Sequence, residues 1–187
     1  MRRILFVAFS SIVLTHAIAL GQPRALGHTV RWDLVQIVQG TELVGGADVA
    51  KDAATGDTFT LIGSGDAKPA EREAAGGGTI VHHFAATNVE ATAVYRVTGF
   101  IDWQPAGGHL EIADGIGDAS EASAGILQMG IRIFLPNGAV RDATLTVNCL
   151  LPEATIDINE GIELSVLGTP FIDMQPDGGA TLCHVQK

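Results

Sequence analysis

Basic residues are scarce in this chain, and their scarcity excludes several classes of partner. The 187 residues include 11 Lys and Arg against 21 Asp and Glu, for a formal net charge of −10 at pH 7. Nucleic-acid binding depends on Lys and Arg side chains that neutralise phosphates, and the sequence contains no basic cluster. Anionic membrane surfaces are disfavoured for the same reason. We therefore expect no nucleic-acid partner.

Aromatic residues and recognisable catalytic motifs are also few. Phe, Trp and Tyr make up 5% of the chain, so the exposed aromatic platforms of sugar-binding proteins are not indicated. Trp32 and Trp103 fall in alternating segments typical of strands, which favours core positions for both. The sequence Gly63-Ser64-Gly65 lacks the Gly-x-Ser-x-Gly pattern of a nucleophile elbow. No repeat of fixed period indicates a propeller or solenoid, and we identify no catalytic residue.

The longest hydrophobic run lies at the N-terminus. Arg2 and Arg3 precede an apolar stretch over residues 4–20, which ends in the small residues that signal peptidase accepts. This pattern predicts a cleaved signal peptide over residues 1–21 and a secreted or periplasmic protein. An uncleaved anchor is the alternative, because the run approaches the roughly 20 residues that span a bilayer. We expect no stable membrane span after cleavage, and a single all-β domain over residues 22–187.

The chain has only two cysteines, Cys149 and Cys183. No Cys-x-x-Cys spacing indicates redox chemistry. Two cysteines in an exported chain most simply pair with each other, so we predict a disulfide bond between them. Such a bond would stabilise the fold by roughly 3 to 4 kcal/mol on the chain-entropy model. Two free thiols are the alternative.

The remaining sequence is dominated by short alternating or β-rich segments separated by Gly, Pro, Asn and Asp, a pattern typical of strands and turns. The clearest prediction is a hairpin of residues 126–135 and 141–150 around the turn Pro136-Asn137-Gly138. Residues 67–75 are predicted to form a loop, residues 42–54 are weakly patterned, and residues 119–124 favour a helical turn. Further strands are predicted at residues 29–34, 58–63, 79–85, 93–103, 109–112, 155–158, 162–167 and 181–186.

About eight to ten strands without an amphipathic helix predict an all-β fold. Two architectures satisfy this pattern, an antiparallel β-sandwich and a closed β-barrel. The sequence does not distinguish them.

Three segments carry a resemblance to known proteins: residues 57–65, the glycine run and strand at residues 76–82, and the ending at residues 181–185. They resemble a group of small exported bacterial proteins to which no function is assigned. The resemblance covers most of the chain after residue 21 and implies secretion and a β-rich fold, with no activity or ligand to carry over. A looser similarity in size and strand content relates the chain to the dirigent and allene oxide cyclase barrels.

Histidines are the candidate metal ligands, because imidazole is the commonest protein ligand of transition metals. His82 and His83 are adjacent, so a regular strand points them to opposite faces and only one can join a given site. His109 and Glu111 have the spacing to share a face of a strand. Together with His82, His83 or His184, they define a candidate site for zinc or another divalent transition metal. Ordinary polar or strand-edge positions are the alternative for all of these histidines.

A candidate calcium site lies in the acidic loop over residues 114–121. Asp114, Asp118 and Glu121 supply carboxylates, and the glycines between them supply accessible backbone carbonyls. The loop lacks the alternating acidic positions of an EF-hand, so a turn with exposed acids is the alternative. We expect no organic cofactor.

These observations favour a secreted all-β protein that acts by binding or by a structural role. The alternative is a small extracytoplasmic enzyme with a pocket inside a β-barrel, in which His82 or His83 joins His109 and Glu111. A deep pocket that gathers these side chains would favour the enzyme, and scattered histidines would favour the binding protein.

Overall fold

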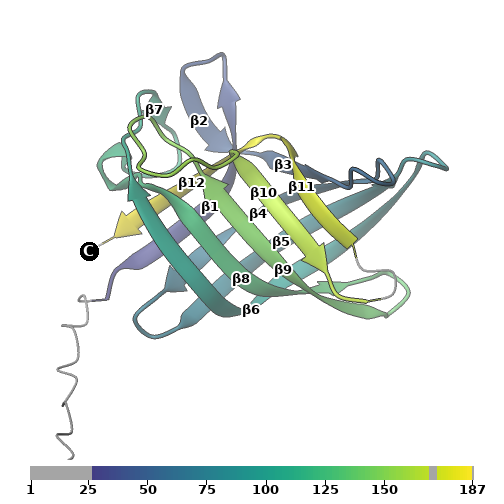
Figure 1. Cartoon of the computed structure of the whole chain (residues 1–187). Helices are drawn as coiled ribbons and strands as arrows, with labels where there is room; N and C mark the ends of the chain where they lie inside the picture. Colours follow the sequence, from purple (N-terminus) through teal and green to yellow (C-terminus); the bar gives the residue numbers. More distant parts are fainter. Residues whose placement is uncertain (1–26, 169–171, 187) are drawn as a thin grey trace, which may run out of the picture.

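The computed structural model describes residues 27–168 and 172–186, which form an all-β structure (Figure 1). The predicted signal peptide, residues 1–21, lies outside the described residues. Within them, no helix has the length and apolar character needed to cross a membrane. The elements are β1 (Thr29–Val38), β2 (Glu42–Gly45), β3 (Ala47–Lys51), β4 (Thr58–Lys68), β5 (Glu73–Phe84), β6 (Val89–Gly107), β7 (Ala113–Asp114), the 3-10 helix η1 (Ala119–Glu121), β8 (Ala124–Phe134), β9 (Val140–Cys149), β10 (Gly161–Val166), β11 (Ile172–Gly178) and β12 (Ala180–Gln186).

Strand pairing closes on itself into a ring. The twelve strands belong to one sheet, in which eight follow one another in the order β3-β11-β10-β9-β8-β6-β5-β4. The pairing of β3 with β4 joins the two ends of this series, and every junction in the ring is antiparallel. The predicted all-β class is confirmed.

Strands β1 and β12 lie across one end of the ring. The first half of β4 pairs with β3, and its second half pairs instead with β1. β12 then pairs with β1 along seven residues and reaches β9, where the Cys149 Sγ lies 3.6 Å from the Thr181 carbonyl oxygen. Trp32, Leu34 and Cys183 are buried on the inner face of this β1–β12 pair. These side chains fill that end of the ring.

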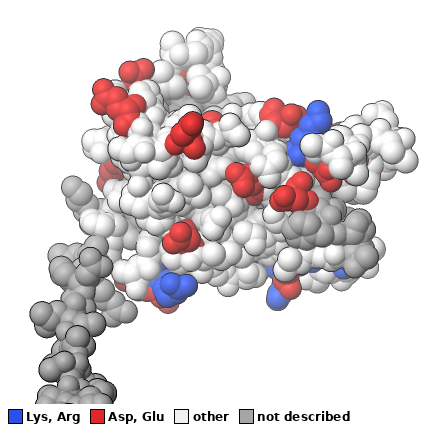
Figure 2. Space-filling view, in the orientation of Figure 1, with Lys and Arg blue, Asp and Glu red and all other residues white. Residues whose placement is uncertain are grey.

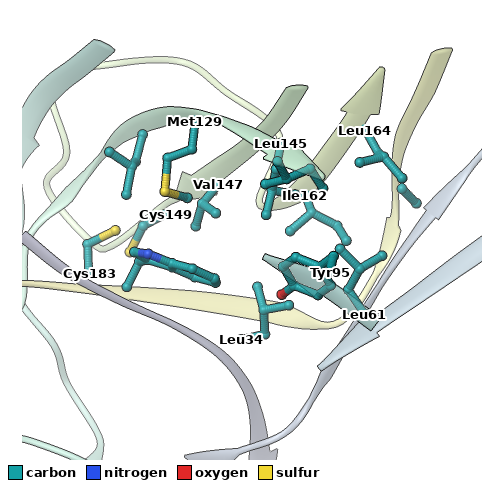
Figure 3. Packing of buried hydrophobic residues seen from close by; sticks show 14 of the residues in the cluster. Leu34, Leu61, Tyr95, Met129, Leu145, Val147, Cys149, Ile162, Leu164 and Cys183 are labelled. Atoms are coloured by element: carbon teal, nitrogen blue, oxygen red, sulfur yellow. The ribbon is translucent and has the colours of Figure 1, made fainter. Parts of the chain in front are cut away.

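The core follows from strand alternation. Every second residue of β8 from Leu127 to Ile133 is buried, and so is every second residue of β9 from Ala143 to Cys149. The hairpin predicted for residues 126–135 and 141–150 is therefore confirmed. Figure 3 shows inward-pointing side chains of several strands packed against one another; those labelled are Leu34, Leu61, Tyr95, Met129, Leu145, Val147, Cys149, Ile162, Leu164 and Cys183.

Glycines allow β4 and β5 to pass close to bulky core residues. A Cβ atom on Gly63 would lie 2.1 Å from the Tyr95 hydroxyl oxygen, and one on Gly65 would lie 2.9 Å from the Trp32 indole nitrogen. Both distances are too short for any side chain. The glycines thus make room for the two largest side chains that are fully buried in the core.

Several local predictions were wrong. The loop predicted over residues 67–75 is shorter than expected: only residues 69–72 form a turn, because β4 extends to Lys68 and β5 begins at Glu73. Residues 109–112 and 155–158 are not strands, and the weakly patterned residues 42–54 hold β2 and β3. β11 was missed because Pro176 and its polar neighbours obscure alternation, although the strand pairs with β10 and β3. The predicted helical turn is confirmed as η1.

The predicted disulfide bond is absent, and both cysteines are free thiols. Cys149 and Cys183 lie next to each other in the core (Figure 3), each fully buried. They belong to strands that are not paired in the sheet, β9 and β12. A hydrogen bond to Cys149, together with burial, raises the pKa of the Cys183 thiol well above its ordinary value. The contact predicted between the two strands exists, but packing and hydrogen bonding maintain it.

Buried thiols predict a specific labelling pattern. In native protein, a thiol reagent should react slowly with both cysteines, because neither side chain is exposed. In denatured, unreduced protein it should add two labels, as expected for two free thiols. Intact mass spectrometry measures both results. Denatured protein that takes no label before reduction would contradict the structure.

The close approach at Gly63 predicts a large effect of a small substitution. Gly63→Ala should lower the free energy of unfolding by about 2 kcal/mol, because overpacking a core position typically costs 1 to 3 kcal/mol. Gly99→Ala, in β6, is the matched control because its Cβ would meet nothing within 4 Å; it should change stability by less than about 0.5 kcal/mol. Urea unfolding of both variants checks the difference. Equal losses of unfolding free energy in the two variants would show that Tyr95 does not restrict the space at Gly63.

Candidate functional site

The described residues enclose a cavity of about 500 Å³ in the ring. It lies at the end away from β12: along β9, Arg141 lines the cavity, whereas Cys149 contacts β12. In Figure 1 this end is on the right, with the β5–β6 and β8–β9 turns. The lining side chains are mostly apolar, namely Phe59, Ile80, Phe84, Ala91, Ala93, Ile133, Leu135, Pro136, Val166 and Leu167.

Three polar side chains also line the cavity: His82, Asn137 and Arg141. His82 follows Ile80 on the inner face of β5. Asn137 lies in the β8–β9 turn, where its side-chain oxygen accepts a hydrogen bond from the Ala139 backbone N–H. Arg141 lies near the start of β9. The cavity therefore combines an apolar wall with a few polar groups, the usual composition of small-molecule sites.

His82 is held in place by a carboxylate and two aromatic rings. Its Nε2 lies 3.1 Å from Oδ2 of Asp57, and Asp57 itself accepts a hydrogen bond from the Ala85 backbone N–H at 2.9 Å. The imidazole ring contacts Phe59 and Phe84, with ring centroids 4.2 and 3.7 Å away. The contact with Asp57 and the two aromatic rings therefore fix the orientation of the imidazole ring at the cavity.

The structure separates the other histidines that were predicted as metal ligands. His83 points to the opposite face from His82, as predicted, and lies 3.8 Å from Glu90. His109 and Glu111 do lie together, 3.6 Å apart, in an exposed loop with Glu153. Among residues 27–168 and 172–186, no three His, Cys, Asp or Glu side chains form a group that could hold a metal ion. Zinc binding by these residues stays a prediction.

His184 contacts Asp114, a residue of the candidate calcium loop. Its Nε2 lies 2.7 Å from Asp114 Oδ2, while the other Asp114 oxygen accepts hydrogen bonds from the backbone N–H groups of Ile116 and Gly117. A Cβ atom on Gly117 would lie 2.5 Å from the His184 ring. These contacts fasten residues 114–117 onto the outer face of β12.

The remaining candidate calcium ligands serve local structure. Asp118 caps η1 by accepting hydrogen bonds from the backbone N–H and the hydroxyl of Ser120, and Glu121 lies within η1. Since Asp114 and Asp118 already bind protein donors, the structure supports turn and capping roles for both. Calcium binding stays a prediction.

Charges around His184 extend to β1. Arg31 forms an ion pair with Asp33 at 2.9 Å and donates to the Ile116 carbonyl. Burial raises the pKa of Asp33, an effect that Arg31 partly offsets. Burial acts in the same direction on Asp114, but hydrogen bonds from His184 and the backbone outweigh it and hold the pKa of Asp114 below its ordinary value. This cluster is buried and away from the cavity, so we assign it a structural role.

Two more carboxyl groups, the buried Asp48 and the half-buried Glu160, lie at the filled end of the ring. Asp48 points inward from β3 and accepts a hydrogen bond from the Val49 backbone N–H, while its second oxygen has no partner within the described residues. Burial raises the pKa of Asp48 to about 7, and the charge of Glu160 adds to the effect. Burial also raises the pKa of Glu160, which accepts hydrogen bonds from Thr181 and the Leu150 backbone N–H.

Comparison of the chain with protein-family models, curated proteins and solved structures finds no match. The site is therefore interpreted from its own geometry.

Sequence reasoning identified His82 but missed the side chains that surround it. Asp57 is 25 positions from His82 in the chain, and only the pairing of β4 with β5 brings them together. A usable signal was present for Arg141, because it has the same parity as the apolar residues Leu145, Val147 and Cys149 of the same predicted strand. That parity places Arg141 on the inner face, at the end of the ring.

Asp48 predicts a pH-dependent stability. Its folded-state pKa of about 7 exceeds the unfolded value near 3.8, so the folded state binds the proton more tightly. The resulting stabilisation is complete below the unfolded pKa and is lost as the pH rises through about 7. Asp48→Asn should remove this loss, which amounts to about 4 kcal/mol over the whole range between the two pKa values and to roughly 2 to 3 kcal/mol between pH 5 and pH 8, since one pKa unit corresponds to about 1.4 kcal/mol.

Urea unfolding at about pH 5 and about pH 8 measures the effect. Asp102→Asn, an exposed position in β6, is the control and should retain the wild-type difference between the two pH values. If Asp48→Asn also retains that difference, Asp48 is ionised without penalty in the folded protein.

Proposed function

We propose that this protein is exported, loses residues 1–21, and binds a small apolar molecule inside a closed β-barrel formed by the ring. The observation that carries the proposal is the 500 Å³ cavity with its predominantly apolar lining. Ligand sites typically have volumes of about 300 to 1,000 Å³ and combine such linings with a few fixed polar groups. An eight-stranded barrel is also of the size that accommodates one small ligand.

The distribution of packing supports this role. At the end crossed by β1 and β12, the interior is occupied by Trp32, Leu34 and Cys183, all buried. At the other end, the side chains do not fill the interior, and β6 contributes only the small residues Ala91 and Ala93 to the cavity lining. A purely structural protein gains stability by filling its interior, because each void sacrifices packing contacts. An apolar cavity retained at one end is better explained by a ligand.

The Asp57–His82 pair favours a second candidate, an enzyme that transfers a proton to or from the bound molecule. A histidine oriented by a carboxylate in a secluded pocket is a common arrangement for general acid–base catalysis. This candidate differs from the metal-assisted enzyme considered from sequence, because His83, His109, Glu111 and His184 do not line the cavity. A bound molecule recovered in chemically altered form would favour it over simple binding.

Filling the cavity should weaken binding. We expect N-phenylnaphthylamine, a neutral apolar dye, to bind the wild-type protein with a rise in fluorescence. Ala91→Phe should weaken this binding at least about tenfold, which corresponds to 1.4 kcal/mol, because Ala91 lines the cavity. Thr92→Phe is the matched control: Thr92 is the next residue of β6 and is exposed, so it should bind as the wild type does.

Fluorescence titration measures all three affinities, and circular dichroism confirms that each variant is folded. Equal weakening by both variants, or no saturable dye binding by the wild type, would overturn the proposed function.

A further inference from the structure

The geometry points to a ligand of defined chemistry: an apolar molecule that ends in a single carboxylate group, which pairs with Arg141 at the mouth of the cavity. This inference rests on the proposed function, because it describes the molecule that would occupy the same cavity. It adds the chemical class of the ligand and the residue that recognises its polar end.

Strand geometry directs Arg141 towards the cavity. Side chains alternate along β9, and Arg141 has the same parity as the buried residues Ala143 and Leu145. It lies opposite Ile133 of β8, which also lines the cavity. The guanidinium group of Arg141 therefore lies at the edge of the apolar cavity lining.

The charge of Arg141 is not neutralised within the described residues. Its Nη1 donates to the carbonyl of the preceding residue, Val140, at 3.1 Å, and no described carboxylate lies within ion-pair distance. The adjacent outward-facing pair is different: the Nε of Arg132 lies 2.8 Å from Asp142. In the β8–β9 hairpin, the outward-facing Arg132 is therefore paired with an acid, whereas the inward-facing Arg141 has no acidic partner within the described residues.

Charge is distributed unevenly between the cavity and the rest of the protein. The chain has 21 acidic residues, and acidic side chains outnumber basic ones on the face shown in Figure 2. None of the acidic residues lines the cavity, whose titratable side chains are Arg141 and His82. Asp57 lies beyond His82 and binds its Nε2. The cavity is consequently suited to an anion in a protein that otherwise repels anions.

These features favour a carboxylate over a more highly charged group. A guanidinium fork binds a carboxylate through two parallel hydrogen bonds. A phosphate monoester would bring close to two negative charges at neutral pH, against one arginine in a strongly acidic protein. Each methylene group fills roughly 30 Å³, the volume that one water molecule occupies in the liquid. The volume of a chain of about twelve carbons is therefore smaller than that of the 500 Å³ cavity, and such a chain fits inside it.

The test compares dodecanoate with dodecanol, which share a hydrocarbon chain and differ in the charged end. Each displaces N-phenylnaphthylamine from the wild-type protein, and the titrations give two dissociation constants. We expect dodecanoate to bind about tenfold more tightly than dodecanol. Arg141→Gln should remove this preference, so that dodecanoate and dodecanol bind the variant with equal affinity. Arg132→Gln, on the outer face of the hairpin, should retain the preference.

The outcomes separate the two proposals. If both molecules displace the dye with equal affinity from the wild type, the carboxylate inference is overturned while the apolar binding function stands. A preference that survives in Arg141→Gln would also overturn it. If neither molecule nor the dye binds, the proposed function itself fails. Added salt should narrow the preference, since an ion pair at an exposed rim is screened.

Discussion

Closure of the ring is the constraint on which the rest of the structure depends. The pairing of β3 with β4 satisfies strand edges that would otherwise be open to other chains, and it also encloses an interior that side chains must fill. β4 meets two requirements at once, because its first half completes the ring and its second half carries β1. The β1–β12 pair fills one end, and the other end keeps the cavity.

The two ends of the ring differ in the charged groups that they carry. At the filled end, carboxyl groups of Asp48 and Glu160 are enclosed by packed strands, and burial raises the pKa of both. At the open end, Arg141 is exposed and lines the cavity. Buried carboxyls near β12 therefore contribute to local architecture, whereas the charged group at the mouth is available to a ligand.

The sequence allowed the fold class and the inner faces of individual strands to be predicted, because alternation is a local property. Residues of β8 and β9 were assigned to the correct face. Closure was not predictable, since it depends on register between distant segments. The same limit applied to the site: His82 was identified as a residue, but Asp57 joins it only through β4–β5 pairing. Two adjacent cysteines were likewise mistaken for a covalent link.

Strand pairing and closure place the histidines that were predicted as metal ligands on different sides of the ring. The ring sends His82 inward and His83 outward, leaves His109 in an exposed loop, and places His184 on the outer face of β12 beside Asp114. Coordination requires several ligands on one side of the sheet, and closure distributes these residues over different sides. The same alternation gathers apolar side chains and Arg141 around one space. The topology that disperses the histidines thus also forms a cavity with a mostly apolar lining.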